Sequence, residues 1–509
     1  MDDVGAGLGW VNWRLILWVI QNNYLTSRIN LKMTIMKHVL LKCFAPLGVM
    51  AMAACAAEAP SEGEYKPRVV ILTDIAPVET EPDDMESMVR LLSHADLYEI
   101  EAIITASGWN SSGREYPEEW GQYLQTVIDA YEKDLPNLMK RSEQSEFKPL
   151  AEEADKQMIG YWPSADYLRS RVFSGSKYLG VSHIGADNVS PGSDYILSLT
   201  REDDERPLWV LVWGGGNTVA QSLWQARNSD DKELLGDVLD KIRIYTITDQ
   251  DVDWIKRAQH DLSSHQWMRE EFGDSLFFIW DESAWLSQNE IGAAHWPEYE
   301  QHIQGKGNMG AVYPRYRWGV EGDTPSFLYV MPTGLNDPEN PSDISWGGYF
   351  KSGMTADSVT SCYTNISPEV KAVSRKYEEL FYPAVFNNFA ARMAWAHEGK
   401  GNRNPVAVVN GKKGLAPIVV NARGGESITL DASQSTDPDG DNINVNWSLL
   451  PEAGNADVEG VVIADPDSPK TELTLPALDK GSRVNVLCTV TDNGTPVLTS
   501  YRRVIIDIE

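Results

Sequence analysis

The stretch Leu72–Val89, LTDIAPVETEPDDMESMV, joins the end of a strand-like run to a helix-like run through a loop rich in carboxylates. The strand-like run begins at Arg68 and is mostly apolar, as buried strands of parallel sheets are. From Asp83 to His94 the apolar residues recur at helical spacing. Because ligands of open parallel sheets bind beyond the carboxyl ends of the strands, the stretch predicts a parallel sheet with an acidic site at its edge.

The same alternation continues along the chain to about residue 400. Glu99–Ser107 is strand-like, Glu118–Leu138 is helix-like, and a long helical pattern over Pro368–His397 closes this part. The other short apolar runs, which we expect to be strands, are Leu208–Trp213, Ile242–Thr248, Leu276–Trp280 and Ser326–Met331. Apolar strands that alternate with helices predict an α/β fold, with a mostly parallel sheet and helices on both of its faces.

A different pattern follows the linker-like segment Glu398–Arg403. Short alternating runs, separated by the turn signals DPDGD and DNGTP, predict a small all-β, immunoglobulin-like sandwich. We therefore place the α/β domain at 67–398 and the sandwich at 404–509, with a tether at 56–66. Cys362 and Cys488 fall in different domains, so no disulfide framework is expected.

The segment before the tether has the features of an export signal. From Met36 it carries a basic part, an apolar part and the tetrapeptide MAAC, which ends at Cys55. MAAC resembles a bacterial lipobox, in which the cysteine becomes the first mature residue and carries a lipid. We assign residues 1–55 to a signal segment that ends at this cysteine, and expect residues 1–54 to be removed, with translation starting at Met33 or Met36. The protein would be secreted across the inner membrane and lipid-anchored at the outer membrane, on its periplasmic or surface face. An ordinary cleaved signal is the alternative.

The charge of the chain excludes some partners. There are 44 basic and 74 acidic residues, which give a formal net charge of −30. Such a chain repels nucleic acids and anionic membrane surfaces, so we expect no nucleic acid as partner and membrane contact only through a lipid anchor. The hydrophobic content of 42% is that of an ordinary globular protein and does not identify a substrate.

Three carboxylates mark the edge of the predicted sheet. Asp74 ends the first strand, and Asp83 and Asp84 begin the next helix. Asp83 and Asp84 alone could cap this helix and favour its dipole. Three converging carboxylates, however, repel one another unless a cation neutralises them, and hard oxygen ligands select Ca²⁺ or Mg²⁺. The sequence therefore predicts a divalent cation site.

The pattern resembles the opening signature of the nucleoside hydrolases, a strand followed by D-x-D-x-G-x-D-D and a helix. Asp74 matches the second Asp, which in that family binds calcium and activates the attacking water. Asp83 and Asp84 match the closing pair. Two departures stand out: Leu72 replaces the first Asp, and the loop before Asp83 is longer than in the family.

Two later segments resemble the same family. LWVLVWGGGNT, at 208–218, is similar to the family's strand and turn that supply a backbone carbonyl to the calcium. EGDTPSF, at 321–327, is similar to the late segment that supplies a distant Asp. Read alone, each would be a tight turn. The resemblance implies Ca²⁺ bound by Asp74, Asp84, Asp323 and the Trp213 carbonyl, with Asp83 reaching a water or a donor that does not itself touch the ion.

Most of the mature chain also resembles the nucleoside-hydrolase-like family of secreted cellulose-binding proteins, in which a small β-sandwich follows the first domain. The segments that carry this resemblance include SPGSDYILS at 190–198, YTITDQD at 245–251 and GLNDPENPSDISWGGYF at 334–350. It implies a carbohydrate partner, either a glycoside substrate or cellulose or another polysaccharide.

The resemblances imply a calcium-dependent hydrolase of N- or O-glycosyl bonds acting on extracytoplasmic carbohydrate, with Asp74 activating the water. Asn110 resembles a family asparagine that contacts the sugar, although a turn residue would look the same. No histidine stands beside Asp323 to protonate the leaving group. The residues expected to contact the substrate or supply that proton are Glu321, Asp249 and Asp251; each could instead be a surface acid.

The alternative function is a lipoprotein that binds polysaccharide and keeps the hydrolase fold without activity. The missing first Asp and the missing His favour it. So do four tryptophans expected to be exposed, Trp109, Trp120, Trp162 and Trp346, since exposed rings can stack on sugars. The sequence does not fix the sugar, the linkage, the general acid or the oligomeric state.

Overall fold

The computed structural model describes residues 65–111, 113–251, 263–355 and 361–509. The signal segment expected at 1–55, its lipobox cysteine and nearly all of the tether lie outside these residues. Within the described ranges, none of the helices combines the length and the apolar character needed to cross a membrane.

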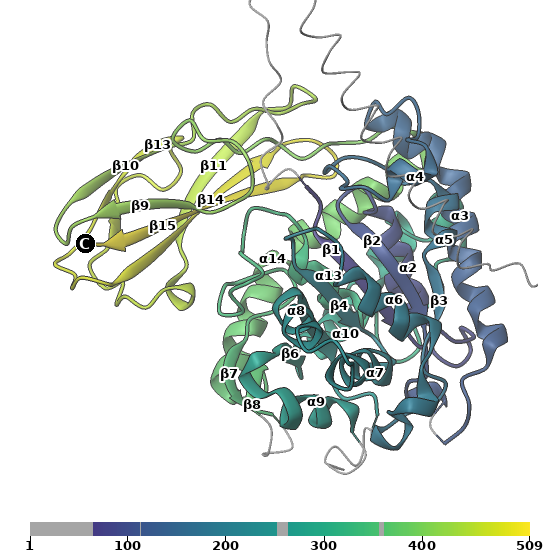
Figure 1. Cartoon of the computed structure of the whole chain (residues 1–509). Helices are drawn as coiled ribbons and strands as arrows, with labels where there is room; N and C mark the ends of the chain where they lie inside the picture. Colours follow the sequence, from purple (N-terminus) through teal and green to yellow (C-terminus); the bar gives the residue numbers. More distant parts are fainter. Residues whose placement is uncertain (1–64, 112, 252–262, 356–360) are drawn as a thin grey trace, which may run out of the picture. The chain divides into compact units, whose positions relative to one another are not determined.

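The first part of the described chain is built around one eight-stranded sheet (Figure 1). The strand order is β3-β2-β1-β4-β5-β6-β8-β7, and only β7 and β8 pair antiparallel. The strands are β1 (Arg68–Thr73), β2 (Glu99–Thr105), β3 (Val172–Ser174), β4 (Leu208–Val212), β5 (Ile242–Ile247), β6 (Phe277–Asp281), β7 (Lys351–Met354) and β8 (Ser361–Thr364). This sheet confirms the predicted α/β class.

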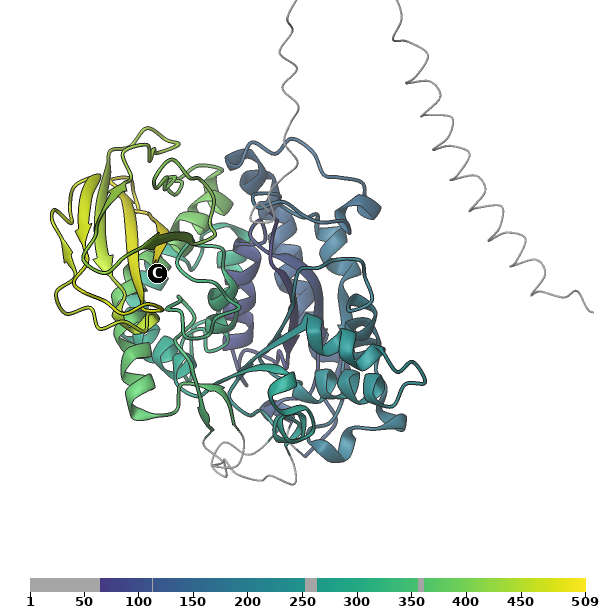
Figure 2. The ribbon, with the colours of Figure 1, turned by 60° about the vertical axis from the view of Figure 1, so that its left-hand side comes forward.

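Helices cover both faces of the sheet, as the views of Figures 1 and 2 show. Along β1, Val69 and Ile71 pack into one core, whereas Val70 and Leu72 pack into the other, because successive strand residues point to opposite faces. The first core includes residues of α2 (Asp83–Ser93), α3 (Gly121–Arg141), α10 (Ala284–Ala294) and α14 (Pro368–Glu398). The second includes residues of α6 (Pro191–Leu199), α7 (Gly216–Arg227), α8 (Leu234–Lys241) and α9 (Ser264–Phe272).

The order of the strands reverses between β1 and β4. From β1 the chain continues to β2 and β3 on one side, and from β4 it continues to β5 and β6 on the other. Such a switch point opens a crevice at the carboxyl ends of the strands. Asp74 follows β1 and Trp213 follows β4, and the Trp213 amide donates to the Leu72 carbonyl at 2.8 Å. The fold therefore places the acidic loop where such sheets bind ligands.

One expected strand is a helix. The prediction of a strand over Ser326–Met331 is wrong, because α13 is helical from Thr324 to Val330. All seven residues of α13 are buried, and a short run that is buried on every side does not reveal its period. Pro325 in the first turn favours a helix start. The long helix predicted over Pro368–His397 is confirmed as α14.

The chain beyond α14 forms two packed sheets, which confirms the predicted sandwich. One sheet has the order β10-β13-β12, with β10 at Ser427–Asp431, β13 at Lys470–Thr474 and β12 at Val462–Ile463. The other has the order β11-β14-β15-β9, with β11 at Ile443–Leu449, β14 at Arg483–Asp492, β15 at Thr499–Ile508 and β9 at Ile418–Ala422. Trp447 and Cys488 pair across β11 and β14 in the sandwich core. Cys362 and Cys488 are both buried and unbridged.

A buried ion pair connects the sandwich with the α/β part. Arg503 on β15 contacts Asp343, which lies between α13 and β7, and Arg503 Nη2 donates to Asp343 Oδ1 at 2.7 Å. Both side chains are only 1% exposed. Removing one partner of such a pair leaves the other charge buried and uncompensated, which costs about 3–5 kcal/mol.

We therefore expect Arg503→Met to lower the free energy of unfolding of the full chain by about 3–5 kcal/mol in urea titrations. The matched control is Arg483→Met, also in the sandwich, whose ion pair with Asp507 spans 2.7 Å between side chains that are 47% and 33% exposed. That change should cost less than about 1 kcal/mol. Equal effects of the two substitutions would contradict the structural role of the buried pair.

Candidate functional site

A cavity of about 590 Å³ lies at the switch point of the sheet. Its acidic lining residues are Asp74, Glu81, Asp83, Asp84, Glu290 and Asp323. Its aromatic lining residues are Trp109, Trp213, Trp285 and Trp318. These residues follow strands β1, β2, β4 and β6 or precede α13, so segments far apart in the sequence build one site.

Three carboxylates form a compact group in this cavity. Asp83 and Asp84 lie in the first turn of α2, and Asp323 immediately precedes α13. One oxygen of each carboxylate lies within 4.8 Å of the others. Three acidic residues in the first turn of α2 favour this helix through its dipole, which explains why the sequence begins a helix there.

The hydrogen bonding of the group suits a hard cation. Asp83 Oδ1 and Asp323 Oδ2 are buried and have no hydrogen-bond partner among the described residues. Buried polar atoms are nearly always paired, so unpaired carboxylate oxygens call for a ligand. Asp84 Oδ1 accepts a hydrogen bond from the Thr73 hydroxyl, which fixes its orientation. Because the donors are all oxygens, the residues fit Ca²⁺ or Mg²⁺.

Asp74 lies beside the compact group, in a cradle made by two glycines. A Cβ atom at Gly108 would lie 2.1 Å from Asp74 Oδ2, and one at Gly214 would lie 2.3 Å from Oδ1. Asn110 Nδ2 donates to Asp74 Oδ2 at 3.3 Å, so the predicted sugar-contacting asparagine touches the predicted base. Asp83, which was expected to reach the cation only through water or another donor, belongs to the group of three carboxylates. Asp74, which was expected to bind the cation directly, lies next to this group.

Burial changes the acidity of these carboxyls. It raises the pKa of Asp74 to about 7, an effect to which the Asp83 charge adds, and it raises the pKa of Asp83 to about 6. The pKa values of Asp84 and Asp323 are raised well above the ordinary value, first by burial and then by the neighbouring carboxylates. A cation bound among these carboxyls would favour their ionised forms and lower these pKa values.

Glu321 does not line the cavity, so the expectation that it contacts a substrate is corrected. Its side chain is fully buried and pairs with Arg90 Nη1 at 2.5 Å, and Tyr313 Oη donates to it at 3.0 Å. Its amide donates to Glu86 Oε2 at 2.7 Å. Glu321 therefore anchors the turn that presents Asp323.

Asp249 and Asp251 also lie outside the lining of this cavity. Gln250 between them reaches the lining, and its Oε1 accepts a hydrogen bond from the Trp109 amide at 3.4 Å. The two carboxylates instead form a separate group with His265 on α9. The expectation that they contact the cavity's substrate is therefore corrected.

The aromatic wall of the cavity, formed by Trp109, Trp213, Trp285 and Trp318, was only partly predictable from the sequence. Trp120, Trp162 and Trp346, expected to be exposed, are buried in the core, whereas Trp109 does line the cavity. Trp318, not anticipated, is 72% exposed at the cavity, and its indole nitrogen donates to the Thr80 carbonyl of the acidic loop at 3.3 Å. The nearness of Trp318 to Asp323 in the sequence is the signal that could have identified it as a residue of the site.

The comparisons with known proteins agree with the fold. Residues 68–350 match the family described as cellulose-binding Sde182, nucleoside hydrolase-like domain, and residues 427–508 match that of the cellulose-binding protein Sde0182, C-terminal domain. A solved structure of a nucleoside hydrolase-related hypothetical protein from Saccharophagus degradans, associated with carbohydrate metabolism, is 32% identical. The match covers 87% of this chain and 100% of that chain, with a TM-score of 0.73.

The PKD domain from KIAA 1837 protein matches 18% of this chain and 81% of its own at 21% identity. Its TM-score of 0.14 is too low to support an argument. No curated protein matches the chain.

The close approach of Gly214 to the Asp74 carboxylate leads to a prediction. A Cβ at Gly214 cannot coexist with the present position of the Asp74 carboxylate. If the expected calcium site is present, Gly214→Ala should weaken calcium binding at least about tenfold, and it should lower stability by about 1–3 kcal/mol. Calcium titration calorimetry and urea unfolding measure the two effects. Gly236→Ala in α8 is the control, because its Cβ would meet no atom within 4 Å. Unchanged calcium binding by Gly214→Ala would show that the cradle does not constrain the site.

Proposed function

We propose that this chain, which belongs to the cellulose-binding Sde182 family with a nucleoside hydrolase-like domain, is a calcium-dependent hydrolase of glycosyl bonds in extracytoplasmic carbohydrate. The observation that carries this proposal is the convergence of Asp74 and the group Asp83, Asp84 and Asp323 in one tryptophan-lined cavity. Fold membership alone would not suffice, because one fold serves many activities.

The chemistry assigned to the residues follows from their positions. Asp83, Asp84 and Asp323 would hold the calcium, with Asp74 and the Trp213 carbonyl beside them. Bound calcium would lower the pKa of a water and align sugar hydroxyls. Asp74 takes the proton of the attacking water at a carboxylate oxygen, while Asn110 keeps this carboxylate oriented. The water oxygen bonds to the anomeric carbon as the bond to the leaving group breaks, and the leaving group departs with the bonding electron pair and takes a proton from solvent.

The aromatic wall supports a sugar rather than a charged substrate. Trp109 and Trp285 meet edge to face with ring centroids 6.5 Å apart, and both line the cavity. Sugar rings present C–H faces that pack on indoles while their hydroxyls remain available to carboxylates and amides. The combination of oxygen ligands and indoles therefore favours a glycoside.

The second candidate function is a non-catalytic protein that binds cellulose or another polysaccharide. One observation specifically favours it: Trp318 is 72% exposed and holds its ring at the cavity through the Thr80 carbonyl. An exposed, oriented indole can stack on a sugar ring.

We also propose that the protein is exported and carries a lipid on Cys55, which the MAAC tetrapeptide supports. Replacing Cys55 by Ser should move the protein from the membrane fraction to the soluble extracytoplasmic fraction of a bacterial host. Continued membrane retention of this variant would contradict lipid attachment at that residue.

The enzyme proposal is tested on the full mature chain after chelator treatment. We expect one calcium ion to bind in titration calorimetry, and Asp84→Asn combined with Asp323→Asn to abolish this binding, because two ligand charges are lost. Hydrolysis across a panel of glycosides should require calcium and fall at least about 100-fold in Asp74→Asn, which removes the base. Asp187→Asn, at an exposed position, is the matched control and should change neither calcium binding nor hydrolysis.

The outcomes separate the two functions. A folded parent that binds no calcium would refute the site itself. Calcium binding without hydrolysis of any glycoside, combined with loss of cellulose retention in Trp318→Ala, would establish the non-catalytic alternative. Retention that is unaffected by Trp318→Ala would refute that alternative.

A further inference from the structure

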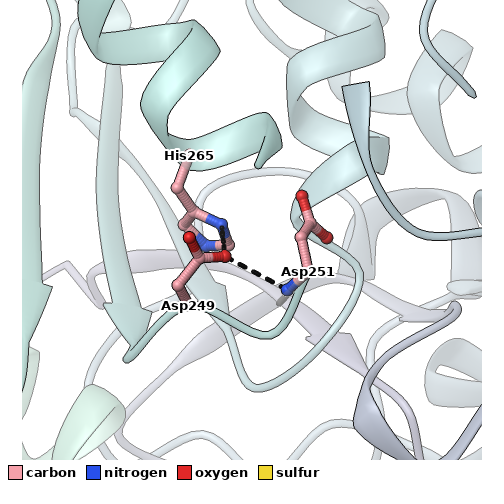
Figure 3. A group of neighbouring side chains, drawn as sticks. All are labelled: Asp249, Asp251 and His265. Atoms are coloured by element: carbon pink, nitrogen blue, oxygen red, sulfur yellow. Dashed lines mark hydrogen bonds and ion pairs between the residues drawn. The ribbon is translucent and has the colours of Figure 1, made fainter. Parts of the chain in front are cut away.

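A second group of ligand-type side chains, distinct from Asp83, Asp84 and Asp323, consists of Asp249, Asp251 and His265 (Figure 3). Asp249 and Asp251 follow β5, and His265 lies in the first turn of α9. One oxygen of each carboxylate and one ring nitrogen of His265 all lie within 4.8 Å of one another. His265 Nδ1 lies 3.0 Å from Asp249 Oδ1, and Figure 3 shows the imidazole reaching from its helix toward the Asp249 carboxylate.

The group is buried and incompletely paired. His265 is 0% exposed and Asp251 is 7% exposed. Asp251 Oδ1 and His265 Nε2 have no hydrogen-bond partner in the described part of the chain, and no described lysine or arginine forms an ion pair with either carboxylate. A carboxylate that is more than nine-tenths buried with an unpaired oxygen is costly unless a cation compensates it.

The surroundings orient all three side chains. Ser263 Oγ donates to Asp249 Oδ2 at 2.5 Å, and the Ser264 amide donates to Asp251 Oδ2 at 2.6 Å. The Asp251 amide donates to Asp249 Oδ1 at 3.1 Å. Hydrogen bonds that fix ligands in this way are typical of metal sites, because they orient the ligands before the metal binds.

The glycine turn after β4 makes room for the imidazole. A Cβ at Gly216 would lie 2.6 Å from His265 Cε1 and 3.1 Å from Nε2. The Nε2 edge therefore packs on Gly216, while Nδ1 faces Asp249. This leaves Nδ1 as the nitrogen available to a metal.

We propose that Asp249, Asp251 and His265 form a second metal site, which binds a divalent transition metal ion and which zinc suits best. Calcium takes oxygen ligands, whereas an imidazole nitrogen combined with carboxylate oxygens suits zinc and its first-row neighbours. Three protein ligands leave a further coordination position for water. Gln250 lies between the two aspartates and lines the larger cavity, so metal binding at this second site fixes part of that cavity's wall.

The competing arrangement is a protonated His265 paired with Asp249. Burial lowers the pKa of His265, but the Asp249 carboxylate outweighs this and raises it. Zinc binds the neutral imidazole, so a protonated His265 would lose its proton before zinc binds. Scattering from a zinc-bound imidazole distinguishes zinc binding by His265 from binding by carboxylates alone.

The test uses the untagged full mature chain, stripped with chelator and then saturated with calcium so that the oxygen-only site is filled. Titration with zinc chloride should show one ion bound. His265→Asn and Asp251→Asn should each weaken zinc binding at least about tenfold, since loss of outer-shell partners alone costs about 10–100-fold. His302→Asn on α11 (Trp296–His302) and Asp84→Asn are controls and should retain it.

X-ray absorption on the zinc-loaded parent needs no variant. It should show only nitrogen and oxygen in the first shell, with the scattering of one imidazole. Zinc binding that is only millimolar, that survives in folded His265→Asn and Asp251→Asn, or that shows no imidazole scattering would each overturn the proposal. Loss of calcium binding in Asp84→Asn with retained zinc binding would separate this site from the proposed calcium site.

Discussion

The crowding of four carboxylates, three of them buried and one half-buried, at one edge of the sheet is the constraint on which the α/β part depends. Two like charges 4 Å apart repel by about 4 kcal/mol at an effective dielectric constant of 20. A whole domain is stable by only about 5–15 kcal/mol, so Asp74, Asp83, Asp84 and Asp323 cannot all ionise there without compensation. Their raised pKa values are the response of the protein alone, which takes up protons. A bound cation would let the same carboxylates ionise without this repulsion.

Much of this arrangement could be predicted from the sequence, because it rests on local patterns. The apolar run before Asp74 and the acidic start of the helix at Asp83 fix the ends of β1 and α2. The turn over Gly214–Gly216 likewise marks the end of β4. Each of the three positions takes glycine for a different physical reason. Gly214 leaves space for Asp74, Gly215 adopts a φ of +74°, and Gly216 leaves space for His265. The reasons themselves became visible only in three dimensions.

The parts that the sequence did not predict are those set by contacts between distant segments. Glu321 resembles a site acid in sequence, but its partner Arg90 lies 231 positions earlier and draws it into the core. Asp249 and His265 are 16 positions apart on different elements, so no local spacing in the sequence indicates that their side chains are close. The burial of Trp162 and the exposure of Trp318 follow from packing that composition does not encode.

The ion pair between Arg503 and Asp343 restricts how this protein can be recombined with others. Carbohydrate-active proteins are commonly treated as strings of exchangeable modules. Here, replacing the sandwich by an unrelated module would remove the guanidinium that compensates Asp343, an aspartate that belongs to the other part. A chimera joined after α14 would therefore require a neutral residue at position 343. For engineering, the two parts therefore behave as one unit, although their folds are of different classes.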